Sequence, residues 1–120
     1  MNTTVTDLMT PDVVVTYAQK TLGEVRCKML ERHIHAIVVL GPDERPSGIV
    51  TSTDFLEHLV CDEMRVAKCP MRKVLTISHD ESPAEAAKRM QDNDLHHLVV
   101  MKDDKIAGIL SSFDLLEVVC

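Results

Sequence analysis

One stretch of this chain occurs twice, and this repeat restricts the possible folds more than any other feature of the sequence. Residues 48–59, Gly-Ile-Val-Thr-Ser-Thr-Asp-Phe-Leu-Glu-His-Leu, return sixty positions later as residues 108–119, Gly-Ile-Leu-Ser-Ser-Phe-Asp-Leu-Leu-Glu-Val-Val. The similarity continues upstream, where residues 35–39 match residues 96–100 at an offset of sixty-one. A period near sixty exceeds the roughly 20–50 residues of solenoid repeats, so we expect two halves related by a pseudo-two-fold axis.

Size and charge narrow the class of protein. A chain of 120 residues lies in the single-domain range, and either half alone would bury too little surface, so we expect one shared core. The net charge of -6 opposes binding to nucleic-acid phosphates, and an aromatic content of 2% leaves no stacking platform for bases. We therefore exclude nucleic acid as a partner.

The cysteines and the hydropathy pattern predict a soluble, cytoplasmic protein. The chain has no Cys-x-x-Cys pair, no signal-peptide core at its amino terminus, and no apolar run near the roughly 20 residues of a membrane span. A zinc site built from Cys61, Cys69 and histidines is an alternative, but this spacing matches no compact ligand motif. Buried or incidental thiols are the preferred interpretation, and four cysteines are concerned: Cys27, Cys61, Cys69 and Cys120.

The periodicity of the first copy predicts strand, helix, strand, hairpin strand and helix. The expected ranges are 13–16, 21–33, 36–40, 48–50 and 52–64. Thr21 and Glu24 have the spacing of a capping box at the start of the first helix. The buried stripe of that helix is expected to consist of Leu22, Val25, Met29 and Leu30.

The second copy repeats this order. It predicts a strand over 74–77, a helix that starts at Ser82-Pro83, a tight turn at 102–105 and a closing helix over 112–119. The connecting segment carries Met64, Val66 and Met71, so we expect it to pack on the surface and not to act as a flexible tether. We place the first domain at 1–64, the connector at 65–73 and the second domain at 74–120, in an α/β (α+β) fold.

Each copy places a hydroxyl and a carboxylate three residues apart where a strand meets a helix: Thr51 with Asp54, and Ser111 with Asp114. One interpretation is structural, because Ser/Thr-x-x-Asp caps helices. The other is ribose binding, since an ionised Asp accepts two hydrogen bonds from a vicinal diol while a hydroxyl and free helix amides bind a phosphate. In that case Ile49 or Ile109 would offer its side chain to the flat face of a base.

The doubled pattern of strand, helix, strand, Gly-hydrophobic-x-Ser/Thr-x-x-Asp and helix resembles a tandem pair of CBS domains, named after cystathionine beta-synthase. The resemblance covers residues 5–119. It implies two domains, each a small mixed sheet with two packed helices, that associate through their sheets. It also implies two clefts, which in many members bind AMP, ADP, ATP, S-adenosylmethionine or NAD-type ligands, in a sensor or regulatory module without a catalytic activity.

The resemblance assigns ligand-binding roles by position. Ribose would bind Asp54 in one cleft and Asp114 in the other, helped by the hydroxyls of Thr51, Thr53 and Ser111. Each cleft would also use the opposite copy. The wall facing Asp54 would consist of Val74, Leu75 and His96, and the wall facing Asp114 of Thr10, Val13, Val14 and His35.

Two departures from the family pattern bear on the ligand. Where members often carry Arg or Lys beside the middle strand, this chain has His35, Ala36, His96 and His97, which penalises a triphosphate more than a monophosphate, a nucleoside or a cationic adenosyl ligand. Phe113 stands where the first copy has Thr53 and removes one hydroxyl. We therefore expect the Asp54 cleft to be the better ribose site.

The leading functional hypothesis is a regulatory, energy-sensing module that binds AMP, ADP, ATP or S-adenosylmethionine, holds no cofactor or metal, and acts on an unidentified partner protein. The alternative is an interaction scaffold with empty clefts that forms a homodimer through its closing helices. The residues concerned are Leu56, Leu59, Leu116 and Val119. We expect no enzyme, because Asp54 and Asp114 lie in different copies and no lysine-bearing glycine loop is present.

Overall fold

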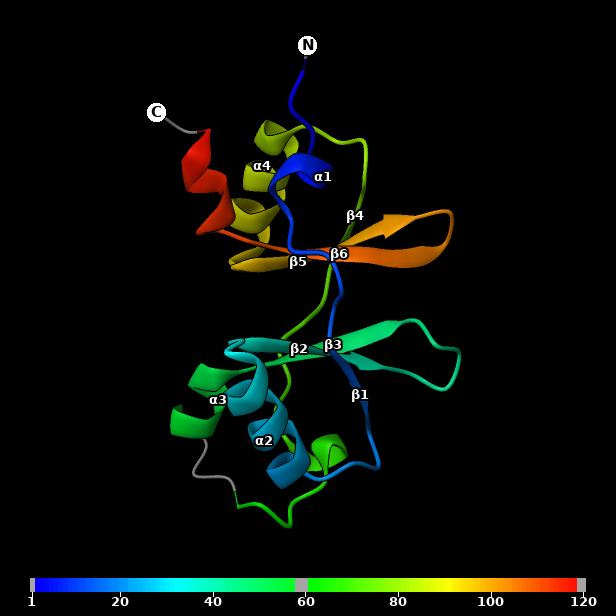
Figure 1. Ribbon diagram of the computed structural model, residues 1–120, viewed down its shortest axis with the longest axis vertical. Helices are drawn as coiled ribbons and strands as arrows, with labels where there is room; N and C mark the ends of the chain where they lie inside the picture. Colours follow the sequence, from blue (N-terminus) through cyan, green and yellow to red (C-terminus); the bar gives the residue numbers. More distant parts are fainter. Residues whose placement is uncertain (1, 58–60, 119–120) are drawn as a thin grey trace. The chain divides into compact units, whose positions relative to one another are not determined.

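The computed structural model describes residues 2–57 and 61–118, which form two compact units. Of these residues, the first-copy unit contains 14–57 and 61–73, and the second-copy unit combines 2–13 with 74–118. The segment that precedes the first repeated strand therefore packs with the second copy. The expected α/β class is confirmed, because each unit holds a three-stranded mixed sheet with helices (Figure 1). The division of the chain into domains 1–64 and 74–120 with a connector at 65–73 stays a prediction.

In the first-copy unit the strand order is β1-β2-β3, with β1 parallel and β3 antiparallel to β2. The strands are β1 (Val15–Tyr17), β2 (Ala36–Leu40) and β3 (Pro46–Thr51). Helices α2 (Leu22–Arg32) and α3 (Ser52–Glu57) lie on one face of this sheet (Figure 1). The range 36–40 was predicted correctly, since an unbroken aliphatic run suits a strand that is buried on both faces.

The second-copy unit repeats the same topology, with the order β4-β5-β6. Its strands are β4 (Thr76–Ser78), β5 (His97–Lys102) and β6 (Lys105–Ser111), and its helices are α1 (Val5–Leu8), α4 (Pro83–Asn93) and the 3-10 helix η2 (Asp114–Glu117). Asp103 and Asp104 have φ of 50° and 66°, which gives the two-residue turn expected at 102–105.

Each unit contains a cluster of buried hydrophobic residues, and the shared core expected from size stays a prediction. Each unit borrows a segment from outside its own repeat. Val5 of α1 joins the second-copy cluster, and Val66 and Cys69 of the connector join the first-copy cluster. These segments add apolar area, so each sheet has a hydrophobic core of its own. The expectation that the connector packs on the protein is confirmed, since Val66 is fully buried within the 3-10 helix η1 (Val66–Lys68).

Helix α2 begins as its sequence predicts, but one residue of its expected stripe is wrong. The Oγ1 of Thr21 accepts a hydrogen bond from the Glu24 amide at 3.2 Å. Leu22 and Val25 are fully buried, whereas Leu30 is 65% exposed. At 100° per residue, Leu30 lies about 140° around the helix from Val25, beyond the edge of the buried face.

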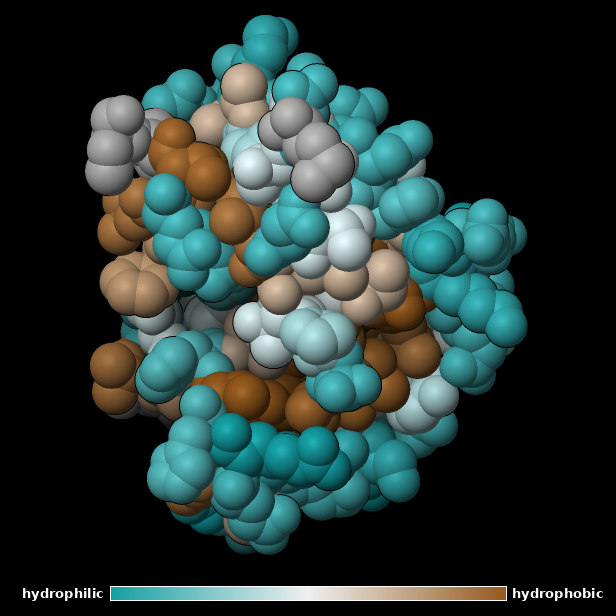
Figure 2. Space-filling model, turned by 45° about the horizontal axis from the view of Figure 1, so that its top comes forward, coloured by the Kyte–Doolittle hydropathy of each residue, from teal (hydrophilic) through white to brown (hydrophobic). Residues whose placement is uncertain are grey.

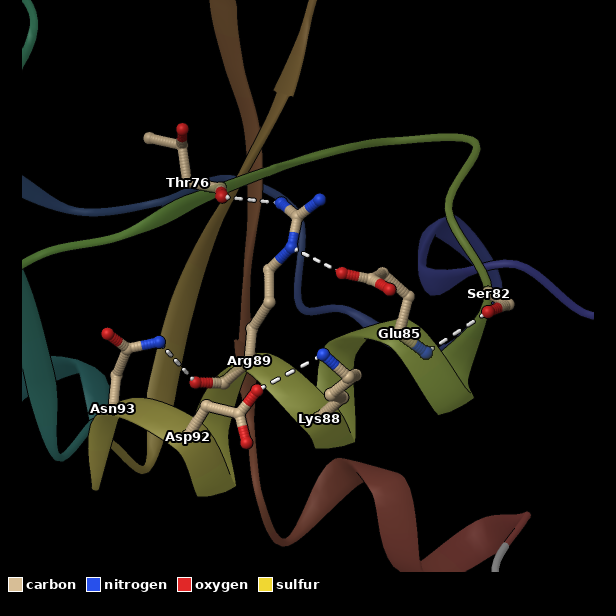
Figure 3. A network of polar contacts seen from close by, with 7 residues as sticks. All are labelled: Thr76, Ser82, Glu85, Lys88, Arg89, Asp92 and Asn93. Carbon is tan, nitrogen blue, oxygen red and sulfur yellow. Dashed lines mark hydrogen bonds and ion pairs between the residues drawn. The ribbon is translucent and has the colours of Figure 1, made fainter.

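Helix α4 is capped at its start and tied to the sheet by a polar network (Figure 3). The Oγ of Ser82 accepts from the Glu85 amide at 3.1 Å, as its capping spacing predicts. The side chain of Arg89 donates to the Glu85 carboxylate at 2.8 Å and to the Thr76 carbonyl oxygen of β4 at 3.1 Å. This arginine therefore joins the helix to the edge strand.

Both helices that follow the repeated motif differ from the expected ranges. The predicted helix 52–64 is confirmed over Ser52–Glu57 and is wrong over residues 61–64, while residues 58–60 lie outside the described residues. The carbonyls of Asp62 and Met64 accept hydrogen bonds from the first amides of α2, at 2.9 and 2.8 Å. The chain here turns toward the start of α2, and residues 61–64 are turn and irregular structure. The closing segment is the short 3-10 helix η2 in place of an α-helix over 112–119, and so few residues do not reach a stable α-helical length.

Candidate functional site

The first repeated motif forms a tight junction between β3 and α3, which we call the 51–54 corner (residues 51–54). The Oδ2 of Asp54 accepts from the Thr51 amide at 2.7 Å and from the Thr51 hydroxyl at 3.2 Å. Asp54 is 1% exposed. The carboxylate accepts from the strand-end amide, as the capping interpretation predicts, but the Thr51 hydroxyl donates to Asp54, whereas a capping box would have it accept from the Asp54 amide.

The second motif forms the equivalent 111–114 corner (residues 111–114) between β6 and η2. The Oδ2 of Asp114 accepts from the Ser111 amide at 2.8 Å, and the Ser111 hydroxyl accepts from the Asp114 amide at 3.2 Å. Asp114 is only partly buried. The two corners therefore share a carboxylate oriented by a backbone amide, but they differ in how much solvent reaches it.

Each corner is accompanied by the histidine of its own copy. The Ser52 amide donates to the His35 carbonyl at 2.9 Å, and the Ser112 amide donates to the His96 carbonyl at 2.8 Å. Both imidazoles are exposed, whereas His97 is partly buried. A pocket of about 490 Å³ in the first-copy unit is lined by polar and apolar side chains: Arg26, Met29, Leu30, His33, Ile34, His35, Ser52 and Phe55.

The expected roles of the candidate residues in ligand binding stay predictions. Thr53 is exposed, and Phe113, its counterpart, is 77% exposed. Ile49 and Ile109 lie in β3 and β6, two residues before Thr51 and Ser111. The facing of Asp54 to Val74, Leu75 and His96, and of Asp114 to Val13, Val14 and His35, also stays a prediction.

A short segment pairs with the outer edge of each sheet beside its corner. The amide and carbonyl of Thr10 bond to those of Ile109, both at 2.9 Å. Arg72 pairs with Ile49 in the same antiparallel manner, at 3.2 and 3.4 Å. Thr10 and Arg72 are thus structural counterparts, and the structure brings Thr10 into the same unit as Asp114.

A glycine lies where each edge segment packs closely against its sheet. A Cβ added at Gly48 would lie 2.9 Å from the Sδ of Met71, and a Cβ at Gly108 would meet Met9 and the Thr10 carbonyl. The glycine that begins each repeated motif therefore makes room for the edge segment.

Arg72 is a residue of the site that sequence reasoning missed. Its Nε lies 3.7 Å from the Oδ1 of Asp54, and its terminal nitrogen lies 3.4 Å from the Oε1 of Glu57. The Arg72 side chain is 42% exposed, whereas that of Asp54 is 2% exposed. The sequence pattern placed Arg72 in the connector. Its position before the second-copy strand corresponds to that of Thr10 before the first-copy strand, and this correspondence could have identified Arg72 as a site residue.

The thiols do not form a metal centre in the described part of the chain. Residues 2–57 and 61–118 contain no group of three or more His, Cys, Asp or Glu side chains that could hold a metal ion. Burial, and then the nearby charge of Asp54, raises the pKa of the Cys69 thiol, which is typical of an unreactive cysteine. Cys27 and Cys61 are exposed, and Cys120 lies outside the described residues.

Large hydrophobic side chains also reach the surface, where Figure 2 shows brown groups among teal ones. Leu56 is 82% exposed and Leu116 is 60% exposed. These are two of the positions expected to form a homodimer. The other two, Leu59 and Val119, lie outside the described residues.

The chain belongs to the CBS domain family. The family model matches it twice, at residues 5–61 and 66–120, which confirms the tandem resemblance. No helix in the described part of the chain is long and apolar enough to cross a membrane.

Among curated proteins, the chain is 26% identical to the uncharacterized protein MJ1404 of Methanocaldococcus jannaschii, covering 97% of this chain and 32% of that protein. It is 34% identical to a homoserine O-acetyltransferase of Methanohalophilus mahii, covering 91% of this chain but 23% of the enzyme. The chain thus spans a third or less of the length of these two relatives.

Solved structures share the whole fold. The CBS-domain containing protein ATU1752 of Agrobacterium tumefaciens is 25% identical, with a TM-score of 0.80 over 98% of this chain and 93% of that one. The CBS domain pair of protein MJ0100, solved with 5′-methylthioadenosine and S-adenosyl-L-methionine, is 20% identical, with a TM-score of 0.83 over 98% of this chain and 95% of that one.

Proposed function

We propose that this chain is a regulatory module that binds an adenosyl compound, such as AMP, ADP, ATP or S-adenosylmethionine, through its two corners. The observation that carries the proposal is the duplicated carboxylate, held at 2.7 and 2.8 Å by the amide of the preceding strand end. Each aspartate accepts this bond with Oδ2, and a carboxylate, which has about four acceptor sites on its two oxygens, can accept further bonds from a ribose diol. The binding of two adenosyl compounds by MJ0100 supports this choice of ligand class.

The proposed ribose contacts are the two carboxylates and the neighbouring hydroxyls. They are Thr51, Thr53, Asp54, Ser111 and Asp114. Because Asp54 has hydroxyls on both sides and Asp114 has Phe113 in place of one, we propose the 51–54 corner as the tighter ribose site. The module would act in the cytoplasm without catalysing a reaction, by binding its ligand with different affinity in two conformations that a partner protein distinguishes.

Isothermal titration calorimetry with AMP, ATP, S-adenosylmethionine and 5′-methylthioadenosine tests the proposal. At least one compound should bind, and a ligand at a hundredfold excess over its Kd should stabilise the protein by about 2.7 kcal/mol in thermal unfolding. Asp54→Asn and Asp114→Asn should each weaken binding at one corner. Asp92→Asn is the matched control, because Asp92 is an exposed residue of α4 that pairs with Lys88.

The absence of heat and of thermal stabilisation with all four compounds at millimolar concentration would contradict the proposal. Equal binding by the wild type and by the double variant Asp54→Asn, Asp114→Asn would contradict the assignment of the ribose to the corners.

A homodimeric scaffold is the second candidate, and the exposure of Leu56 and Leu116 favours it. Burial of these side chains against a second copy would remove apolar surface from water. Sedimentation equilibrium of the wild type and of Leu56→Ser, Leu116→Ser tests it. A dimer that dissociates in the variant supports the scaffold, and a wild-type monomer at high micromolar concentration argues against it.

A further inference from the structure

The two corners are alike in their carboxylates but differ in the residue on the adjoining edge segment. Asp54 is followed three residues later by Glu57, and Asp114 by Glu117. The edge segment places Arg72 beside the first corner and Thr10 beside the second, by equivalent backbone pairing with Ile49 and Ile109. The first corner therefore has two carboxylates and a guanidinium, whereas the edge residue of the second is uncharged.

The position of the Arg72 guanidinium is suited to exchange. It lies 3.7 Å from Asp54 and 3.4 Å from Glu57, distances that are long for charge-assisted hydrogen bonds. Its side chain is 42% exposed, so the guanidinium can turn toward a ligand while the buried Asp54 carboxylate stays bound to the Thr51 amide. A guanidinium binds a phosphate through two parallel hydrogen bonds, and this bidentate geometry is stronger than the two longer contacts to Asp54 and Glu57.

We infer that the charge of the edge residue divides the two corners by ligand class, an inference that rests on the proposed function. The 51–54 corner takes an adenosyl ligand with a 5′-phosphate, such as AMP, and Arg72 supplies the permanent cation that residues 35, 36, 96 and 97 do not. The 111–114 corner takes an adenosyl ligand without a phosphate, because its two carboxylates would repel a phosphate and Thr10 offers only a hydroxyl.

AMP and 5′-methylthioadenosine test this inference, because they share adenine and ribose and differ at the 5′ position. In an Asp114→Asn background, calorimetry should show tighter binding of AMP than of 5′-methylthioadenosine. Arg72→Thr, which installs the second-copy residue, should weaken AMP by about 10- to 100-fold, the range of hydrogen bonds to a charged group. It should leave 5′-methylthioadenosine nearly unchanged, and Arg72→Lys should retain part of the AMP affinity.

The reciprocal variant provides an independent test. In an Asp54→Asn background, Thr10→Arg should raise the affinity for AMP and not that for 5′-methylthioadenosine. If Arg72→Thr loses its circular dichroism spectrum, Thr10→Arg still decides the question. AMP binding by the Asp114→Asn protein should also weaken with added salt, whereas 5′-methylthioadenosine binding should not.

The outcomes separate this inference from the proposed function. Equal loss of both ligands in Arg72→Thr, or an unchanged preference, overturns the inference and leaves adenosyl binding standing. The absence of binding by the wild type overturns the proposed function and this inference with it.

Discussion

Removal of the Asp54 carboxylate should destabilise the protein more than removal of its counterpart Asp114. Thr51 is 6% exposed, and its amide donates to Asp54 at 2.7 Å. Asp54→Ala leaves this buried amide without its carboxylate partner, which costs about 2 kcal/mol in the free energy of unfolding. Water can replace the partly exposed Asp114 carboxylate, so Asp114→Ala should cost about 1 kcal/mol.

Urea unfolding followed by far-ultraviolet circular dichroism measures these differences, since the chain has no tryptophan for fluorescence. Asp54→Asn is the control, because its side-chain oxygen can still accept from Thr51, and it should cost less than Asp54→Ala. At roughly 4 °C per kcal/mol, Asp54→Ala should lower the Tm by about 8 °C. Equal costs for Asp54→Ala and Asp114→Ala, or a cost below about 0.5 kcal/mol for both, would refute the reasoning from burial.

Three further predictions concern other parts of the chain. Iodoacetamide should modify exposed Cys27 much faster than Cys69, whose pKa is raised by burial, as peptide mass spectrometry can show; equal rates would contradict this. The hydrogen bond from the Arg26 guanidinium lowers the pKa of Asp62. The pair therefore stabilises the folded state at pH values above the unfolded carboxyl pKa, and this stabilisation is lost as the pH falls through the folded pKa. Asp62→Asn should therefore lower the urea midpoint near pH 7 and match the wild type in strong acid, and a pH-independent difference would count against the pair. Gly48→Ala should cost about 1 kcal/mol in urea unfolding, because its Cβ would lie 2.9 Å from a sulfur atom; an unchanged midpoint would show that this sulfur moves freely.

Local contacts explain which features were predictable. The predictable features depend on residues that are no more than a few positions apart. They are the caps at Thr21 and Ser82, the range of β2 and the hydrogen bonds within both corners. Propensity and spacing carry that information directly. The repeat made it possible to predict the family and the presence of two corners, since each copy forms the same junction between a strand and a helix.

The class of fold, the two copies and the carboxylate of each corner could be predicted from the sequence, because they depend on residue types at fixed short spacing. The surroundings of each corner depend on tertiary packing. Residues 2–13 pack with the second copy, Leu30 is exposed, and Arg72 reaches Asp54 from eighteen positions away. Such contacts depend on how distant segments meet at a sheet edge, which the periodicity of one segment does not record. The repeat thus predicted two similar corners, and packing placed the guanidinium of Arg72 beside the first and the uncharged Thr10 beside the second.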